Sequence, residues 1–193
     1  MENKRLSQKE REKETLYFDA HLILFVQTLH VILTHSASKY GRKDAIGWRT
    51  MKDSTDAEAG PYSWLSYEEF CESARLIGRG LRRLGVSPRQ NVGILHETSH
   101  FWSVSAYGCY SQCVCVCALP TTLGEEKIFS ALSQSDVVAV QTSSLMLTSL
   151  SRLLIQIPSV KFVVVTDPAG AGDARIHEAG LRECGIRIYS WYV

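Results

Sequence analysis

The sequence of 193 residues lacks a strong net charge, and this absence argues against one class of function. Its 21 basic and 20 acidic residues leave a formal net charge of +1 at pH 7. A general nucleic-acid-binding domain is usually strongly basic, so we expect no nucleic-acid partner. The hydrophobic content of 45% and the charged content of 21% are ordinary for a globular protein. The length suits about one domain with a sizeable core.

The sequence also lacks an apolar run long enough to span a bilayer, which needs about 20 residues. The most apolar early stretch, Tyr17–Thr34, is interrupted by Asp19, His21, Gln27 and His30. Its leucines have helical spacing, which favours a helix that packs on its own domain. The alternative is a helix that lies in a membrane interface and gives peripheral membrane contact. Few Lys or Arg residues are present to support that alternative.

The cysteines lack the spacing of a disulfide framework, and no secretory signal opens the chain. We therefore expect an intracellular protein, either cytoplasmic or peripheral on an organelle membrane. Cys109, Cys113, Cys115 and Cys117 lie within nine positions. Zinc sites usually pair two separated C-x-x-C motifs, and three cysteines on one face of a strand cannot surround one ion. We expect these cysteines to be small, buried core residues.

A zinc-protease pattern, H-E-x-x-H, occurs at His96-Glu97-Thr98-Ser99-His100. That chemistry needs both histidines one turn apart on a single helix, with the glutamate beside the metal as general base. Here His96 directly follows the expected strand at 92–95, and Thr98 or Ser99 is a helix-start signal. We therefore expect His96 at a strand end and His100 in a first helical turn, and no metal site.

No serine-histidine-aspartate or P-loop pattern is present, and one glycine loop is a weak match to a dinucleotide site. Gly170 and Gly172 follow an expected strand, but Arg175 stands where G-x-G-x-x-G requires its third glycine. We interpret this loop as a simple connection. Composition and motifs alone therefore predict an intracellular α/β domain without a catalytic constellation.

Strand and helix signals alternate through the chain, which predicts a parallel sheet flanked by helices on both faces. Ser66 and Glu69 form a capping box that opens an amphipathic helix, and Gly85 ends it. A second capping box is expected at Thr122 and Glu125. The remaining expected strands lie at 92–95, 113–119, 137–141, 160–166 and from 186. The expected fold class is α/β.

Several motifs occur in the order and spacing of one enzyme family. Trp64–Phe70 resembles the first core motif of the AMP-forming adenylating enzymes, which include acyl-CoA synthetases, luciferases and peptide-synthetase adenylation domains. Gly108–Glu126 resembles their second core motif. Within that superfamily the chain is most similar to long-chain fatty acyl-CoA synthetases. Their proline-leucine-tyrosine-aspartate-threonine-leucine-glycine run is matched at Leu119, Thr122, Leu123 and Gly124, with departures at Ala118, Pro120 and Thr121.

This resemblance covers roughly Ile46–Val193 and implies the N-terminal subdomain of the acyl-CoA synthetase/luciferase-like fold, incomplete. The family's phosphate loop, its adenine-, magnesium- and ribose-binding motifs and its C-terminal domain with the catalytic lysine would follow Val193. We therefore expect a charged arm over 1–16 and a partial N-terminal AMP-binding domain over 17–193. The alternative interpretation is a non-catalytic α/β binding or interaction module that kept the fold, and a remote further alternative is a zinc hydrolase using His96 and His100.

The full-length family joins a fatty acid to coenzyme A with ATP, through an acyl-adenylate, and releases AMP and pyrophosphate. The resemblance thus implies a fatty acid substrate, with ATP, Mg and coenzyme A as the cofactors of the full-length enzymes. For this chain alone we predict no bound cofactor and no catalytic, cofactor-binding or metal-binding residue. We also predict that it forms no acyl-adenylate on its own, because the motifs that stabilise charge in that step are missing.

Overall fold

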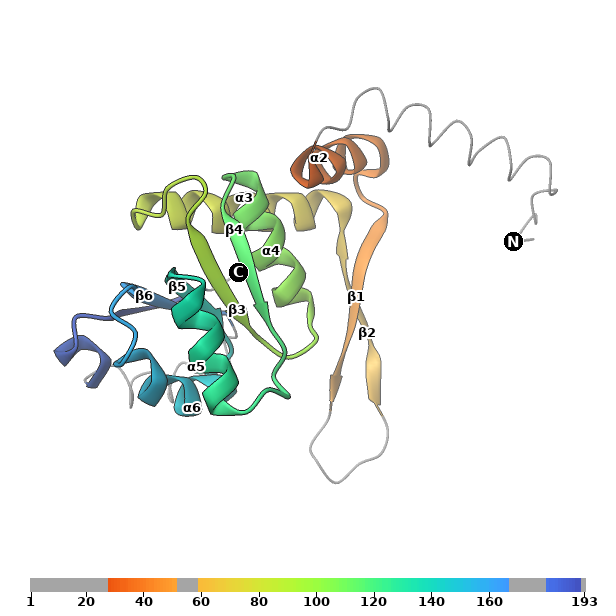
Figure 1. The fold of residues 1–193 in the computed structure, drawn as a ribbon. Coiled ribbons are helices and arrows are strands. Elements are labelled where there is room, and N and C mark those ends of the chain that lie inside the picture. Colours follow the sequence, from red (N-terminus) through yellow and green to blue (C-terminus); the bar gives the residue numbers. More distant parts are fainter. Residues whose placement is uncertain (1–27, 52–58, 167–179, 192–193) are drawn as a thin grey trace.

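A computed structural model describes residues 28–51, 59–166 and 180–191 of the protein (Figure 1). The charged arm at 1–16, the first part of the Tyr17–Thr34 stretch and the glycine loop at 168–173 lie outside these residues. The described elements follow the chain in this order: α2 (Leu29–Tyr40), β1 (Asp44–Met51), β2 (Ala59–Ser66), α3 (Tyr67–Arg83), β3 (Asn91–Leu95), α4 (His100–Ser111), β4 (Cys115–Leu119), α5 (Glu125–Gln134), β5 (Val137–Thr142), α6 (Ser144–Leu154), β6 (Phe162–Val165) and β7 (Arg187–Ser190).

The centre of the fold is a five-stranded sheet in the order β4-β3-β5-β6-β7, with every pair parallel. β5 and β6 are buried along their whole length, as expected for valine-rich strands that are covered on both faces. One core cluster contains residues of α5 and α6, and the other contains residues of α3 and α4. The prediction of a parallel sheet flanked by helices is confirmed.

Helix α3 begins and ends where the sequence predicts. The Ser66 Oγ accepts from the Glu69 amide at 3.2 Å, and the Glu69 carboxylate accepts from the Ser66 amide at 2.8 Å, which completes the capping box. Both bonds satisfy amide groups that a helix N-terminus leaves unpaired. Gly85 has φ +97° just beyond the helix, a left-handed conformation that glycine adopts without strain.

Helices α3 and α4 approach closely at two glycines. A Cβ atom on Gly78 would lie 2.7 Å from the carbonyl oxygen of Gly108, and a Cβ on Gly108 would lie 2.8 Å from the Cβ of Ile77. Only residues without a side chain allow the two backbones to come this close. This contact fixes α4 against α3, and α4 lines the site described below.

The protein also contains an antiparallel hairpin of β1 and β2 that stands beside the parallel sheet (Figure 1). The stretch Ile46-Gly47-Trp48-Arg49 has the composition of a short strand and lies within β1, but the stretch that forms β2 was not predicted as a strand. One face of the hairpin packs on the core through Ile46 and Leu65. Tyr62 and Trp64 on the other face are 58% and 50% exposed.

The prediction that the clustered cysteines are all core residues is wrong for two of them. Cys109 on α4 is fully buried and Cys117 is half-buried, but Cys113 and Cys115 are exposed. The reason is the sheet order, because β4 is an edge strand with a neighbour on one side only. Cys113 lies in the turn before β4 and has φ +55°. The strand therefore begins at Cys115, two residues later than predicted.

The last part of the apolar stretch Tyr17–Thr34 lies in helix α2, which begins at Leu29 and ends at Tyr40. Its Thr28 side chain accepts a hydrogen bond from the Val31 amide, at 3.3 Å. Leu33 is buried in the core cluster of α3 and α4, in agreement with a helix that packs on its own domain, while Leu29 is half exposed. No helix in the described ranges is long and apolar enough to cross a membrane.

Candidate functional site

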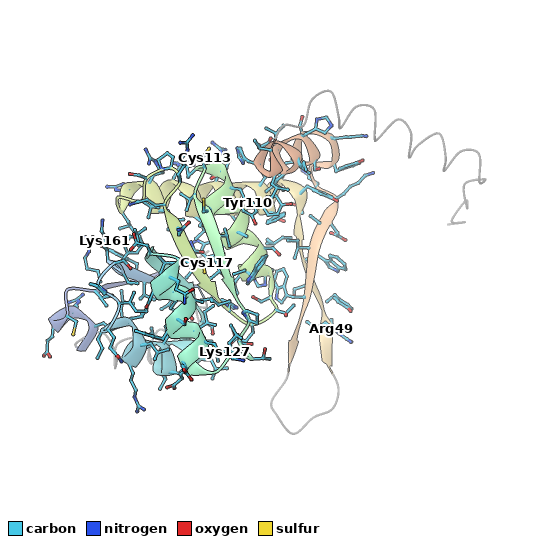
Figure 2. All side chains as sticks on the ribbon, viewed as in Figure 1. Arg49, Tyr110, Cys113, Cys117, Lys127 and Lys161 are labelled. Atoms are coloured by element: carbon cyan, nitrogen blue, oxygen red, sulfur yellow. The ribbon has the colours of Figure 1, made fainter. Side chains whose placement is uncertain are left out.

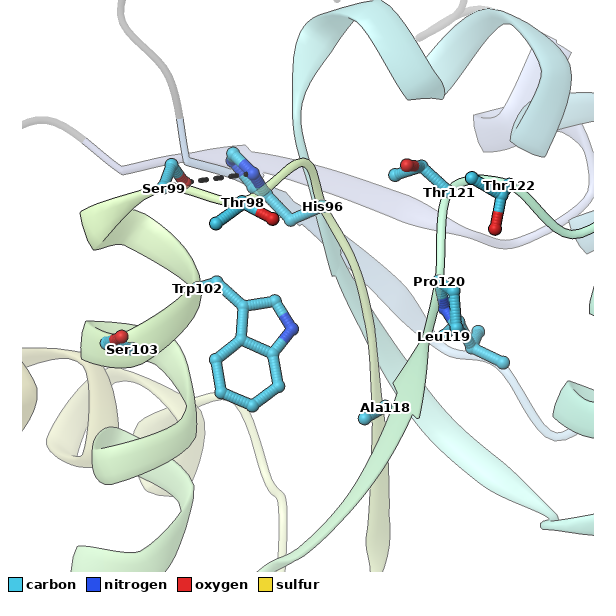
Figure 3. Close-up of a pocket in the computed structure, with 10 residues that line it drawn as sticks. All are labelled: His96, Thr98, Ser99, Trp102, Ser103, Ala118, Leu119, Pro120, Thr121 and Thr122. Atoms are coloured by element: carbon cyan, nitrogen blue, oxygen red, sulfur yellow. Dashed lines mark hydrogen bonds between the residues drawn. The ribbon is translucent and has the colours of Figure 1, made fainter. Parts of the chain in front are cut away.

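A pocket of about 490 Å³ opens at the carboxyl ends of β3 and β4 (Figure 3). Two loops and one helix supply its walls, because the chain leaves both strands at this edge and continues into α4 and α5. In open parallel sheets, ligands characteristically bind outside the carboxyl ends of the strands. The pocket is lined by His96, Thr98, Ser99, Trp102, Ser103, Ala118, Leu119, Pro120, Thr121 and Thr122.

The lining combines apolar surface with several hydroxyl groups. Figure 3 shows the indole ring of Trp102 facing the segment that carries Leu119 and Pro120. Thr98 and Ser99 contribute hydroxyls from one loop, and Thr121 and Thr122 contribute them from the other. A predominantly apolar pocket with a few convergent polar groups is the common form of a small-molecule site.

His96 is the one ionisable residue of the pocket lining, and its ring is held by its neighbours. It is 8% exposed. Its Nδ1 lies 3.0 Å from the Glu97 carbonyl oxygen, 3.2 Å from a Glu97 carboxylate oxygen and 3.2 Å from the Ser99 Oγ. A carbonyl oxygen only accepts, so the hydrogen is on Nδ1. In the neutral ring this leaves a lone pair on Nε2.

A chain of polar contacts joins three elements at this edge. The Ser143 hydroxyl donates to the Glu97 carboxylate at 2.9 Å and accepts from the Met146 amide as the N-cap of α6. Glu97 in turn contacts His96, and His96 contacts Ser99 at the start of α4. The Thr166 hydroxyl donates to the Thr142 carbonyl oxygen at 3.3 Å. These contacts hold the loops after β3, β5 and β6 in a fixed arrangement.

Several buried polar atoms at this edge have no hydrogen-bond partner within the described part of the chain. They are His96 Nε2, the side-chain amide of Gln141 and the hydroxyl of Thr142. Most buried polar groups in proteins are satisfied by protein, water or ligand. The unsatisfied atoms therefore identify the carboxyl edge of β3 and β5 as a place where water or a bound molecule would contribute partners.

The zinc-protease pattern is divided between two elements, as the sequence predicts. His96 follows β3, whereas His100 is the first residue of α4. The His100 ring stacks on Trp48 at a centroid distance of 3.8 Å. Burial, and secondarily His96, lowers the pKa of His100 to about 4. No group of three or more His, Cys, Asp or Glu side chains in the described ranges could hold a metal ion.

Two helix N-termini flank the pocket, and neither has a side-chain cap. Ser99 is the N-cap of α4, but its hydroxyl is directed to His96 instead of the helix amides. Gly124 is the N-cap of α5 and has no side chain. The capping box predicted at Thr122 and Glu125 is therefore wrong, because α5 begins two residues later than that box requires. By contrast, side chains cap α2, α3 and α6.

The pocket was not predicted from the sequence, and among its lining residues only His96 had been considered, as part of the metal-binding pattern. Thr98–Ser103 and Ala118–Thr122 are separated in the chain, and each segment alone is an ordinary strand-to-helix connection. The available signal was topological, because consecutive parallel strands place their following loops at the same edge. That rule would have brought the hydroxyl-rich loops after β3 and β4 together.

These features define an α/β protein with a pocket at the carboxyl edge of a parallel sheet. The chain belongs to the AMP-binding enzyme family, whose model matches residues 33–183. This assignment confirms the resemblance to AMP-forming adenylating enzymes.

Curated relatives of the chain include long-chain fatty acid–CoA ligases. Long-chain-fatty-acid–CoA ligase 4 of Saccharomyces cerevisiae is 29% identical over an alignment of 172 residues that covers 77% of this chain and 25% of the relative. Long-chain-fatty-acid–CoA ligase 1 of Schizosaccharomyces pombe is 24% identical over 91% of this chain and 30% of its own length. The chain therefore spans about a quarter to a third of these relatives.

Solved structures share the fold at low sequence identity. The A-PCP didomain of a carboxylic acid reductase from Segniliparus rugosus, in complex with AMP, has a TM-score of 0.76 and 16% identity. The match covers 89% of this chain and 27% of that one. The adenylation domain of a carboxylate reductase from Mycobacterium chelonae has a TM-score of 0.76 and 18% identity, over 96% and 34% of the two chains.

Proposed function

We propose that this chain is the N-terminal part of a long-chain fatty acid–CoA ligase and that its pocket receives a phosphate-bearing ligand of that reaction. The family assignment and the named activities of the curated relatives support this proposal. The ligand would be a nucleotide or coenzyme A, and the substrate of the complete enzyme would be a fatty acid. We also propose the division into an arm at 1–16 and a partial AMP-binding domain at 17–193.

The observation that carries the proposal is the uncapped N-terminus of α4 at the pocket. A helix N-terminus presents unpaired amides and a partial positive charge, and both favour an anion. The Ser99 hydroxyl contacts His96, so it leaves these amides to another acceptor. The first turn of α4 contains no acidic residue.

The N-terminus of α5 is the weaker of the two anion sites. Its first turn contains Glu125 and Glu126, both of which are exposed. Two carboxylates at this position compensate the helix dipole themselves and repel a phosphate. We therefore place the phosphate at α4 and the apolar part of the ligand against Trp102 and Leu119.

We further propose that the 193-residue chain forms no acyl-adenylate by itself. Adenylation requires cationic groups that stabilise the charge on the transferred phosphoryl group. The residues lining the pocket include neither lysine nor arginine. We therefore make two separate predictions: the chain binds a phosphate-bearing ligand, and it does not form an acyl-adenylate from that ligand.

Ser99→Asp tests the site, because a carboxylate at this N-cap occupies the α4 amides and repels an anion. We expect binding of AMP, ATP or coenzyme A, followed by Trp102 fluorescence or calorimetry, to weaken by about tenfold or more. Asp is among the best N-cap residues, so stability should be unchanged or higher by up to about 1 kcal/mol.

Thr28→Asp is the matched control, since it places the same charge at the N-cap of α2. It should leave ligand affinity unchanged. Adenosine, which has no phosphate, should bind wild type and Ser99→Asp equally. The proposal is wrong if AMP, ATP and coenzyme A all fail to bind the wild-type chain, or if Ser99→Asp binds them as tightly as wild type.

A further inference from the structure

The two ends of the parallel sheet differ in charge. Each described connection from a helix into the next parallel strand lies at the amino ends of the strands, opposite the edge that holds the pocket. We call these connections the amino edge and define them as residues 80–91, 108–115, 131–137, 151–162 and 180–187. Figure 2 shows Cys113 at the amino edge and Lys127, in the first turn of α5, on the opposite side of the sheet.

The amino edge is strongly basic. Three arginines precede β3, namely Arg82, Arg83 and Arg89. Two basic residues precede β6 and two more stand at β7, namely Arg152 and Lys161, then Arg182 and Arg187. Against these seven basic residues stand two acidic ones, Asp136 and Glu183, and all nine side chains are exposed.

The carboxyl edge has the opposite balance. Its connections, counted in the same way over 95–103, 119–128 and 142–147, contain Glu97, Glu125 and Glu126 but only one basic residue, Lys127. The whole chain has a net charge of +1, so the excess of positive charge is local to the amino edge. A local excess of one sign attracts a partner of the other sign.

Helix stabilisation explains some of these cations but not all of them. Basic residues in the last turns of α3 and α6 interact favourably with the negative end of a helix dipole. Arg89, Lys161 and Arg187 lie beyond the helices, at the starts of strands. The helix dipole gives no reason for the charge of these three residues.

Backbone hydrogen bonds hold the same three residues on a rigid frame. The Arg89 amide donates to the Cys113 carbonyl oxygen at 2.7 Å. The Lys161 amide donates to the Val138 carbonyl oxygen at 2.9 Å, and the Arg187 amide donates to the Lys161 carbonyl oxygen at 3.1 Å. Neighbouring strands lie about 4.8 Å apart, so the cations between β3 and β7 extend over about 14 Å. A surface of this width fits a macromolecule better than a single small anion.

The amino edge lacks the exposed aromatic rings that two other kinds of anionic partner use. The aromatic residues of its described segments are Tyr110, which is half-buried, and Phe162, which is buried. Single-stranded nucleic acids stack their bases on such rings, and proteins at a membrane interface place them among the headgroups.

The composition of the amino edge instead suits a protein. Six of its seven cations are arginines, which are enriched in protein interfaces and pair with carboxylates in a bidentate geometry. Ile155, at the end of α6, is 51% exposed and supplies an apolar contact between the charged residues.

We propose that the amino edge docks an acidic surface of another protein, with the arginines on its carboxylates and Ile155 in the apolar part of the contact. This proposal does not rest on the proposed function. The amino edge lies on the opposite side of the sheet from the pocket, and docking is measured without nucleotide or turnover.

Fluorescence anisotropy of a labelled poly-L-glutamate peptide measures docking on the full chain. We expect binding at low ionic strength that weakens by about tenfold at high salt, because exposed charges are screened. Arg89→Gln, Lys161→Gln and Arg187→Gln together should weaken binding by about tenfold.

A second triple variant is the matched control. Lys39→Gln, Arg42→Gln and Lys43→Gln together remove the same number of exposed cations from α2 and the turn that follows it. The net charge of the two triple variants is therefore equal, but the control should bind poly-L-glutamate as tightly as wild type. Circular dichroism establishes that each variant is folded.

Thiol alkylation locates the bound peptide on the wild-type chain. Cys113, Cys115 and Cys184 are exposed within the amino edge, so poly-L-glutamate should slow their reaction with iodoacetamide, followed by mass spectrometry. Leu145→Cys supplies a control thiol at the carboxyl edge, because Leu145 is 71% exposed in the first turn of α6. Alkylation of that thiol should be unaffected.

Four results would overturn the proposal. The first is the absence of poly-L-glutamate binding by the folded wild-type chain at low ionic strength. The second is an equal loss of affinity in the two triple variants. The third is tighter binding to single-stranded DNA or to phosphatidylserine vesicles than to poly-L-glutamate, which would assign the amino edge to another class of partner. The fourth is unchanged alkylation of the three amino-edge thiols in the bound complex, which would place the contact elsewhere.

Discussion

The parallel sheet and the β1–β2 hairpin differ in how many of their faces are covered by other elements. Helices cover both faces of the parallel sheet, so the side chains of its central strands β5 and β6 are buried, and the pocket lies at its carboxyl edge. The hairpin is covered on one face only, and its outer face exposes Trp64 and Tyr62. This is the general contrast between parallel sheets, which are buried, and antiparallel ones, which can face solvent on one side.

The contrast separates two kinds of surface on one small chain. At the carboxyl edge, loops from distant parts of the sequence form a concave pocket with hydroxyl groups and an uncapped helix. On the hairpin, neighbouring residues form a surface of rings. A concave pocket that is mostly apolar and has a few polar groups is the usual form of a small-molecule site, whereas the rings of the hairpin lie on an open surface. If the two regions differ in energy as they do in exposure, substitutions in the parallel sheet should cost more stability than substitutions on the outer face of the hairpin.

The largest effect is expected from truncation in the core of the parallel sheet. Leu132 is fully buried among residues of α5 and α6. Leu132→Ala should lower the free energy of unfolding by about 2–5 kcal/mol, since it loses apolar burial and leaves a cavity. Urea denaturation followed by circular dichroism measures this change. A loss below about 1 kcal/mol would show that this face is loosely packed.

A smaller loss is expected at the crossing of α3 and α4. Gly78→Val would drive a side chain into the Gly108 carbonyl and should cost about 1–3 kcal/mol. Gly80 on the same helix has open space around the position of a Cβ. Gly80→Ala should therefore stabilise the protein by about 0.5–1 kcal/mol. Equal destabilisation by the two substitutions, measured by the same denaturation, would rule out close packing as the cause.

Acid should weaken the contact between the hairpin and helix α4. The pKa of His100 is about 4 in the folded protein, against 6.5 as its usual value. Between these values only the unfolded chain binds the proton, so stability falls as pH decreases from about 6.5 to 4. Because the ring is partly exposed, we expect a loss of about 1–2 kcal/mol after allowance for solvent screening.

Urea midpoints at pH 7.5 and pH 4.5 measure this loss. His100→Phe keeps a ring against Trp48 but cannot take up a proton, so it should reduce the difference between the two midpoints. His35→Gln is the control, because His35 is exposed on α2, and it should retain the wild-type difference. A pH dependence that is identical in His100→Phe and wild type would show that other groups cause it.

The smallest change in stability is expected on the outer face of the hairpin. Trp64→Ala removes a half-exposed ring that contacts Tyr62 and Gly47. Because little burial is lost, the free energy of unfolding should fall by less than about 1 kcal/mol. A loss as large as that of Leu132→Ala would mean that Trp64 is structural, and the difference between the two regions would disappear.

Local signals in the sequence predicted the elements that short-range physics determines. Ser66 and Glu69 give helix α3 its capping box, and alternating strand and helix patterns give the parallel sheet. Position within the sheet is a long-range property, so the exposure of Cys113 and Cys115 could not be derived from their own segment. Likewise, β2 has a strand-like alternation around Trp64, but its pairing with β1 depends on a contact across the hairpin.

The candidate site was less accessible to sequence reasoning than the fold. His96 and His100 match a metal-binding pattern, and the placement of His96 at a strand end and of His100 in a helix was predicted correctly. The pocket itself joins two loops that are about twenty residues apart, and nothing in either loop alone identifies the other. The N-terminus of α4 is uncapped because the Ser99 hydroxyl contacts His96 instead of the helix amides. Only the three-dimensional structure shows this orientation.

The central claim is that this chain carries the fold and a ligand pocket of the AMP-binding enzyme family without the adenylation chemistry. ATP–pyrophosphate exchange with palmitate on the purified 193-residue protein tests that claim most directly, with a full-length fatty acid–CoA ligase as the positive control. We predict no exchange above the level without palmitate. Exchange that requires both palmitate and ATP, and that is lost in Ser99→Asp, would contradict the claim.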